Sequence, residues 1–307
     1  MAMNDSSMTN RTKPQFNISS TNFSYPKAWL FAFGLEAMTI VSLNMLTLIV
    51  LTKTYRLRKR TTYFLINLTV TDLFVGLFPL PMYMVYLAEP LSFSSNRSLF
   101  QAFQSLDMIF GACSIWTLAL ISLERLCIVL VPYVHRSAKR RSYFYAIAFC
   151  WLVPGSVCII GFLANYGVLS RTAYLYLIFL LLLFIPTATL VISHIALAMK
   201  FNQRSNKIRR VRQDNDLSKT LFIVTGTFLV TCLPFQTLVF VIALDPYKNS
   251  PPLIVVIALK LLQYGNSFMN PIIYWPRLPG FKEAARKLVR NKSKRMSTRQ
   301  YLTSSSL

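Results

Sequence analysis

Three polar residues share one face of an otherwise apolar segment that runs from Ser98 to Val134. They are the carboxylate Asp107, the hydroxyl Ser114 and the guanidinium Arg125, separated by steps of 7 and then 11 residues. At about 100° per residue, an α-helix returns such residues to within about 20° of one direction. The rise from Asp107 to Arg125 is roughly 27 Å, close to the hydrocarbon thickness of a bilayer. Because ionisable groups in lipid turn toward a protein interior or a wet cavity, we expect a helix buried among others, with a site near each end.

The remaining segments must supply the helices that surround this one. The 307 residues are 54% hydrophobic and only 14% charged, whereas soluble domains carry about 25% charged residues. A formal net charge of +23 could suit nucleic acid, but most Lys and Arg fall in every second polar segment and in the C-terminal tail. This asymmetry follows the positive-inside rule, so it places the basic segments in the cytoplasm and the N-terminus outside. No nucleic-acid partner is expected, and the lipid bilayer is the surrounding medium.

The apolar segments predict an all-α membrane protein, a seven-transmembrane helix bundle with a short amphipathic helix on the inner membrane surface. The predicted helices lie at about 29–53, 62–87, 98–134, 142–164, 172–199, 218–243 and 252–275. Pro79 and Pro81 predict a kink in the outer half of the second helix. The expected order is an extracellular tail, the seven-helix domain, the amphipathic helix and a cytoplasmic tail. Their bounds are 1–27, 28–276, 277–290 and 291–307.

The expected extracellular tail is rich in Asn, Ser and Thr and carries four glycosylation sequons, and a fifth follows the second helix. A merely polar tail without glycans is the alternative. The chain is therefore expected to be a multi-pass glycoprotein of the plasma membrane. The sequon asparagines are Asn4, Asn10, Asn17, Asn22 and Asn96.

Single residues and short motifs punctuate the seven segments. In chain order they are Asn44, Leu68-Thr-Val-Thr-Asp72, Glu124-Arg125-Leu126, Trp151, Pro186, Phe228, Cys232-Leu-Pro234, Asn270-Pro-Ile-Ile-Tyr274 and Phe281. Their order and spacing resemble the rhodopsin-like (class A) family of G-protein-coupled receptors over about residues 28–290. The resemblance implies a receptor that binds an extracellular ligand, activates a heterotrimeric G protein and recruits arrestin.

The resemblance assigns G-protein coupling to the inner ends of the third, sixth and seventh helices. Arg125 would pair with Glu124 beside it and with an acid at the base of the sixth helix. Asp214 occupies that position, and Asp216 is a close alternative. Breaking such a pair would let the sixth helix swing outward and open an inner cleft. Pro234 weakens the sixth helix where a hinge is expected. The implied set is Glu124, Arg125, Asp214, Phe228, Pro234, Asn270, Pro271 and Tyr274.

A sodium ion is the one cofactor that the resemblance implies, as an allosteric modulator of the inactive state. Its ligands would be Asp72, Ser114, Asn266 and Asn270. Asn266 and Asn270 are four residues apart and share a helix face. One carboxylate with several neutral oxygens suits a hard monovalent cation. A water-filled polar cluster without sodium is the alternative.

The outer end of the stripe predicts a ligand site. By resemblance, Asp107 is where amine receptors hold the ligand's ammonium group, and Tyr264 steadies that carboxylate. A carboxylate among aromatic rings is a sound cation site. Lys260, one turn from Tyr264, offers two alternatives, because it could pair with Asp107 internally or bind a ligand carboxylate or phosphate. The expected ligand-binding set is Asp107, Tyr264, Lys260, Phe235, Gln236 and Gln263.

Two departures from the amine-receptor pattern stand out. Phe100 occupies the outer position of the third helix where amine receptors have a disulfide cysteine. The absence of this cysteine resembles the melanocortin and lipid-receptor branch. Cys232 replaces the usual tryptophan two residues before the proline of the sixth helix. The ligand hypothesis is a small amine-type cation, with a lipid, a peptide or signalling without ligand as alternatives.

Other functional classes fit less well. A transporter or channel would show broken, glycine-rich helices and internal repeats, whereas the chain has 9 glycines and no repeat. The two histidines, His135 and His194, give no metal cluster, and no Ser-His pair or paired aspartates at protease spacing are visible. The chain is therefore predicted not to be an enzyme.

Overall fold

The computed structural model describes residues 27–53, 62–164, 169–204, 210–244, 251–277, 281–283 and 286. Of residues 201–204, 210–222, 274, 276 and 277 only the backbone is described. The two predicted tails and most of the predicted surface helix at 277–290 lie outside these residues. Four of the sequon asparagines are also outside the described residues, namely Asn4, Asn10, Asn17 and Asn22.

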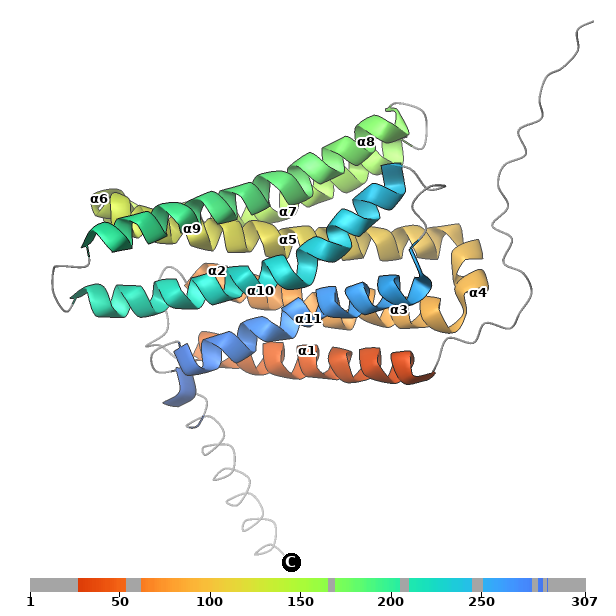
Figure 1. Ribbon diagram of the computed structural model, residues 1–307, viewed down its shortest axis with the longest axis horizontal. Helices are drawn as coiled ribbons and strands as arrows, with labels where there is room; N and C mark the ends of the chain where they lie inside the picture. The colour runs from red at the N-terminus through yellow and green to blue at the C-terminus, as the bar shows by residue number, and fades with distance from the viewer. Residues whose placement is uncertain are drawn as a thin grey trace, which may run out of the picture.

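The described chain is a bundle of long helices that lie side by side, and seven helical segments are long and apolar enough to span a membrane (Figure 1). This confirms the predicted all-α membrane fold. The helices that contain the spans are α1 (Lys27–Lys53), α2 with α3 (Thr62–Leu77 and Pro79–Ala88), α5 (Arg97–Leu130), α7 (Arg140–Ala164), α8 with the π-helical η2 and α9 (Arg171–Ile178, Phe179–Phe184 and Ile185–Arg204), α10 (Arg210–Leu244) and α11 (Leu253–Arg277).

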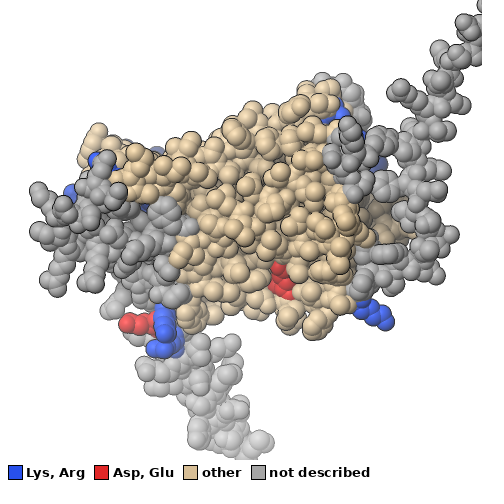
Figure 2. All heavy atoms as spheres, in the orientation of Figure 1, with Lys and Arg blue, Asp and Glu red and all other residues tan. Residues whose placement is uncertain are grey.

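Two short helices mark the opposite ends of the bundle (Figure 1). We call the end with α4 (Pro90–Ser95) the outer end and the end with α6 (Pro132–Ser137) the inner end. On the face seen in Figure 2, lysine and arginine lie toward these two ends, and the band between them is almost free of charge. This distribution is what a bilayer-spanning surface requires.

Proline explains where two helices depart from single continuous rods. The predicted second helix divides at Phe78, before Pro79, because the proline ring fixes φ and removes a backbone donor. The predicted third helix ends at Leu130, and Pro132 begins α6 as a separate helix. The expectation of one uninterrupted helix up to Val134 was therefore wrong at its inner end.

The π-helical turn η2 lies in the fifth span, just before Pro186. Trp116 of α5 donates from its indole nitrogen to the carbonyl of Leu181 in η2, at 3.1 Å. This bond from a neighbouring helix occupies a carbonyl where the regular α-helical pattern is interrupted, and it fixes η2 against α5.

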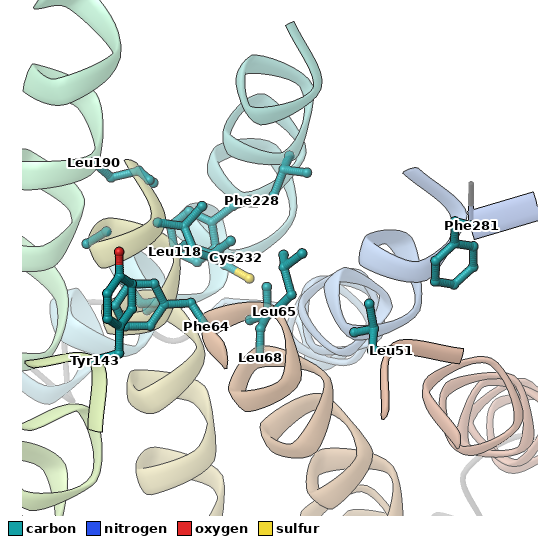
Figure 3. Packing of buried hydrophobic residues seen from close by; sticks show 14 of the residues in the cluster. Leu51, Phe64, Leu65, Leu68, Leu118, Tyr143, Leu190, Phe228, Cys232 and Phe281 are labelled. Atoms are coloured by element: carbon teal, nitrogen blue, oxygen red, sulfur yellow. The ribbon is translucent and has the colours of Figure 1, made fainter. Parts of the chain in front are cut away.

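The largest buried cluster joins α10 to α2 and α5. Phe228 and Cys232 of α10 pack with Leu118 of α5 and Leu68 of α2 (Figure 3). Elsewhere α10 packs mainly against α11 and only sparsely against α5 and α9. The helix that carries Pro234 is thus supported chiefly by α11, so a change in α11 can be passed to it.

Candidate functional site

The outer end of α5 holds a closed ion pair. The Lys260 ammonium of α11 donates to Oδ2 of Asp107 at 2.6 Å, and the Tyr264 hydroxyl donates to the other oxygen, Oδ1, at 3.0 Å. Lys260 also donates to the side-chain oxygen of Gln263 at 3.2 Å. Residues 260 and 264 are one helical turn apart, so both can reach the same carboxylate.

Aromatic rings surround the ammonium group of this pair. Its nitrogen lies 4.5 Å from the ring centre of Tyr264, 4.6 Å from Phe235 and 5.8 Å from Tyr83. The Lys260 side chain is only 3% exposed, and that of Asp107 is 22% exposed. Cation–π attraction strengthens where water is excluded. The ammonium group of Lys260 therefore lies beside Asp107, where a ligand's ammonium group was expected.

A small cavity runs inward from this pair along α5. It is lined by Asp107, Gly111, Ser114, Gln236 and Asn266, among others. The space open to the centres of water-sized molecules is about 30 Å³, which holds about two waters. The cavity connects the two predicted sites, but it must widen before a ligand can enter.

The predicted sodium ligands gather at the inner end of this cavity. Asp72 is fully buried, and its two oxygens accept hydrogen bonds from Ser114 at 3.3 Å and from Asn270 at 2.9 Å. Asn266 lines the same cavity, and its side-chain oxygen accepts from Thr231 of α10 at 3.4 Å. Asp72 thus joins α2 to α5 and α11, and Asn266 links α11 to α10 beside it.

The carboxylate Glu124 has partners that the sequence analysis does not name. Tyr143 of α7 donates to it at 2.9 Å, and His135 of α6 lies 3.4 Å from the same oxygen. Glu124 is buried and Arg125 is half-buried. The contacts tie the inner end of α5 to both α6 and α7. The expected contact of Arg125 with Asp214 stays a prediction, because the Asp214 side chain lies outside the described residues.

A side-chain contact holds the inner half of α10 against α9. The Thr225 hydroxyl lies 3.0 Å from Nε2 of His194, and Nδ1 of the same ring lies 2.8 Å from the Leu190 carbonyl. Both residues are buried. The side chain of Tyr274, which the resemblance assigns to activation, lies outside the described residues.

Three contact residues were not predicted from the sequence. The sequence of each helix does not show which of its sides faces which neighbouring helix. Tyr83, Tyr143 and Thr225 are single polar groups in apolar segments, and nothing in their spacing says which neighbour they meet. Of the expected ligand-binding set, Asp107 and Tyr264 line the cavity, whereas Lys260 and Phe235 are not among its lining residues. Phe228 and Gln263 line it with Gln236, whereas Pro234 borders a separate apolar hollow between α10 and α11.

Comparison with known proteins assigns the class. Residues 43–274 match the seven-transmembrane receptors of the rhodopsin family, so the chain belongs to this family and is a multi-pass membrane receptor rather than an enzyme. It is 23% identical over 265 residues to human trace amine-associated receptor 2, which covers 77% of this chain and 74% of that receptor.

Two further relatives show how broad the family likeness is. Adenosine receptor A3 of Canis lupus familiaris is 25% identical over 78% of this chain and 83% of its own length. The human visual pigment-like receptor peropsin is 25% identical over 83% of this chain and 81% of its own length. These relatives differ in name and in what they respond to, so the likeness identifies the family but no ligand.

Proposed function

We propose that this receptor binds a small extracellular amine-bearing ligand at Asp107 and activates a heterotrimeric G protein by an outward movement of α10. The observation that carries the proposal is the Asp107–Lys260 ion pair of 2.6 Å, a cation already held in an aromatic cage. The site is built for an ammonium group, and the similarity to trace amine-associated receptors is in keeping with it.

The proposed mechanism begins with the exchange of one cation for another. A ligand ammonium takes Asp107, so Lys260 leaves the carboxylate and α11 loses its charged link to α5. Because α10 packs mainly on α11, the change reaches α10 through Cys232, whose sulfur lies 3.9 Å from the Gln263 carbonyl. Opening of the inner end then requires the Thr225–His194 contact to break. Pro234 supplies the weak point in α10.

Signalling without a ligand is the second candidate. It is favoured by the same ion pair, because Lys260 already presents an ammonium group to Asp107. In this case the internal cation would hold the receptor in its signalling form, and removal of Lys260 would lower the basal signal.

We also propose a sodium ion as an allosteric modulator, held by Asp72, Ser114, Asn266 and Asn270. The fully buried carboxylate and the hydroxyl and amide groups around it are hard donors with a single negative charge between them. When bound, the ion would neutralise Asp72. The residues themselves hold α2, α5 and α11 together at this point.

The cellular setting follows from the same proposal. The receptor would lie in the plasma membrane with its N-terminus outside, and arrestin would be a second intracellular partner. Asn96 is exposed at the outer end, where its side-chain oxygen caps the first turn of α5. Its amide nitrogen is the group that a glycan would modify.

The proposal is tested by G-protein activation in cells that express the wild type or Asp107→Ala, screened against amines, lipids and peptides. An amine response that Asp107→Ala loses at equal surface level supports the proposal. Glu89→Ala, at an exposed outer carboxylate, is the matched control and should keep the response. Arg125→Ala should bind the amine without activating the G protein, which separates binding from coupling. An amine response that survives Asp107→Ala would refute the assigned site.

A further inference from the structure

If an amine binds Asp107, Lys260 loses its counter-ion. Its ammonium group is 3% exposed and lies inside a membrane span. If a ligand's ammonium takes Asp107, Lys260 keeps a neutral acceptor, Gln263, and its aromatic rings. Neutral groups do not cancel its charge. Removing one partner of a buried ion pair is strongly destabilising, so a simple amine must offset that loss.

No other described carboxylate is placed to take over Lys260. Asp72 contacts α11 at Asn270, ten residues farther inward than Lys260. Glu36 of α1 also lies beside α11, and its Oε1 lies 3.3 Å from where a Cβ would sit on Gly265. Gly265 is five residues from Lys260, which is about 140° around the helix. Glu36 therefore meets a different face of α11. Among the described residues, Lys260 forms its ion pair with Asp107.

Resting on the proposed ammonium site at Asp107, we infer that the ligand carries a carboxylate as well, and that Lys260 binds it. An amphoteric ligand, with one ammonium and one carboxylate group, replaces both halves of the Asp107–Lys260 pair at once and leaves neither charge alone. A phosphate monoester fits less well, because it carries about −1.5 to −2 at neutral pH against the single charge of Lys260. The ligand class is therefore a small amino-acid-like molecule.

The cavity is open beside Gly111, where the body of such a ligand would lie once the cavity has widened. A Cβ built on this glycine meets no atom within 4 Å, and Gly111 lines the cavity one turn inward from Asp107. The ligand's side chain would extend along this face of α5. Filling the space with Gly111→Leu should abolish binding, whereas Gly155→Leu, at a glycine with equally open surroundings on α7, should leave it intact.

The test uses matched compounds that differ only in the carboxylate: histidine with histamine, tyrosine with tyramine, and tryptophan with tryptamine. Binding is measured as the shift in the unfolding temperature of the purified full-length receptor in lipid nanodiscs. In the wild type, the amino-acid member of a pair should stabilise at a concentration at least about tenfold lower than its amine. In Lys260→Met the preference should reverse, because Asp107 then lacks its cation. Lys260→Arg keeps the charge and should keep the preference for the amino acid.

Three results would overturn the inference: a wild-type preference for the amine, a preference that Lys260→Met leaves unchanged, or no stabilisation of either protein by any member. The last result would overturn the inference because Asp107 has no cation in Lys260→Met, so this variant should bind a simple amine. The measurement contains no G protein, so a receptor that fails to couple refutes the proposed function without affecting this result.

Discussion

Lys260 and Asp107 form an ion pair between α11 and α5, with the ammonium nitrogen 2.6 Å from the carboxylate oxygen. The pair lies in the outer half of the bundle, on the same helix face that carries Ser114 farther in. It links the helix that supports α10 to the helix that bears Glu124 and Arg125. A charge exchange at this one point can therefore act on both the outer and the inner site.

Removing one member of the pair should destabilise the receptor more than removing both. Lys260→Met leaves a partly buried carboxylate without its cation, at a cost of up to about 3–5 kcal/mol. In Lys260→Met with Asp107→Leu, no charge is left in the site, so much of that loss should be recovered. The unfolding midpoints of the two single variants and the double variant measure this coupling. Strictly additive losses would mean that the two side chains do not interact.

Gly76 allows α1 and α2 to approach closely. A Cβ at this position would lie 2.8 Å from Cγ2 of Ile40 and 3.1 Å from Cγ2 of Val41. Gly76→Ala should therefore lower stability by about 1–3 kcal/mol through overpacking. Gly155→Ala, where the added methyl group meets no atom within 4 Å, should be neutral or gain up to about 1 kcal/mol from helix propensity. Equal unfolding midpoints for the two variants would contradict the described helix contact.

The fold was predictable from the sequence because length and hydropathy decide it. All seven spans were found, and the kink before Pro79 follows from the chemistry of proline. The extended helix α10 was not predicted at full length, since its first residues are polar and lie beyond the apolar run. The turn η2 was also missed, and its contact with Trp116 comes from another helix, so the local sequence does not show it.

The site was predictable as a set of residues but not as a set of contacts. The family resemblance placed Asp107 and Tyr264 together. The position of Lys260, one turn from Tyr264, left open whether it pairs with Asp107 or binds a ligand carboxylate or phosphate. The described geometry has the internal pair. The partners of Glu124, in contrast, come from α6 and α7. Such contacts depend on how each helix is oriented about its own axis, and this orientation cannot be predicted from the sequence of one apolar segment.

Thr225 should restrain the opening of α10. Thr225→Val keeps the side-chain shape but removes the hydroxyl that lies 3.0 Å from His194. Loss of one hydrogen bond of about 1 kcal/mol should raise ligand-free G-protein activation about fivefold. Thr237→Val is the control, because the Thr237 hydroxyl is exposed and bonds only within its own helix, to the Leu233 carbonyl at 2.8 Å. An unchanged basal signal in Thr225→Val would remove this contact from the mechanism.

Asp72→Asn should remove any effect of sodium on ligand affinity. The substitution keeps the size of the buried side chain but deletes the only charge among the four proposed sodium ligands. Affinity measured in sodium and in an equal concentration of a large organic cation gives the sodium effect for each protein. If the effect persists in Asp72→Asn at the wild-type level, the ion binds elsewhere.

Ligand-free nucleotide exchange on a G protein, measured with purified wild type and Lys260→Met at equal receptor concentration, tests the central claim most directly. Lys27→Met, at an exposed lysine at the outer start of α1, is the matched control. If the Asp107–Lys260 pair holds the receptor closed, exchange rises in Lys260→Met and stays at the wild-type rate in Lys27→Met. A fall in exchange would instead show that Lys260 acts as a built-in activating cation, and an unchanged rate would show that the pair controls nothing.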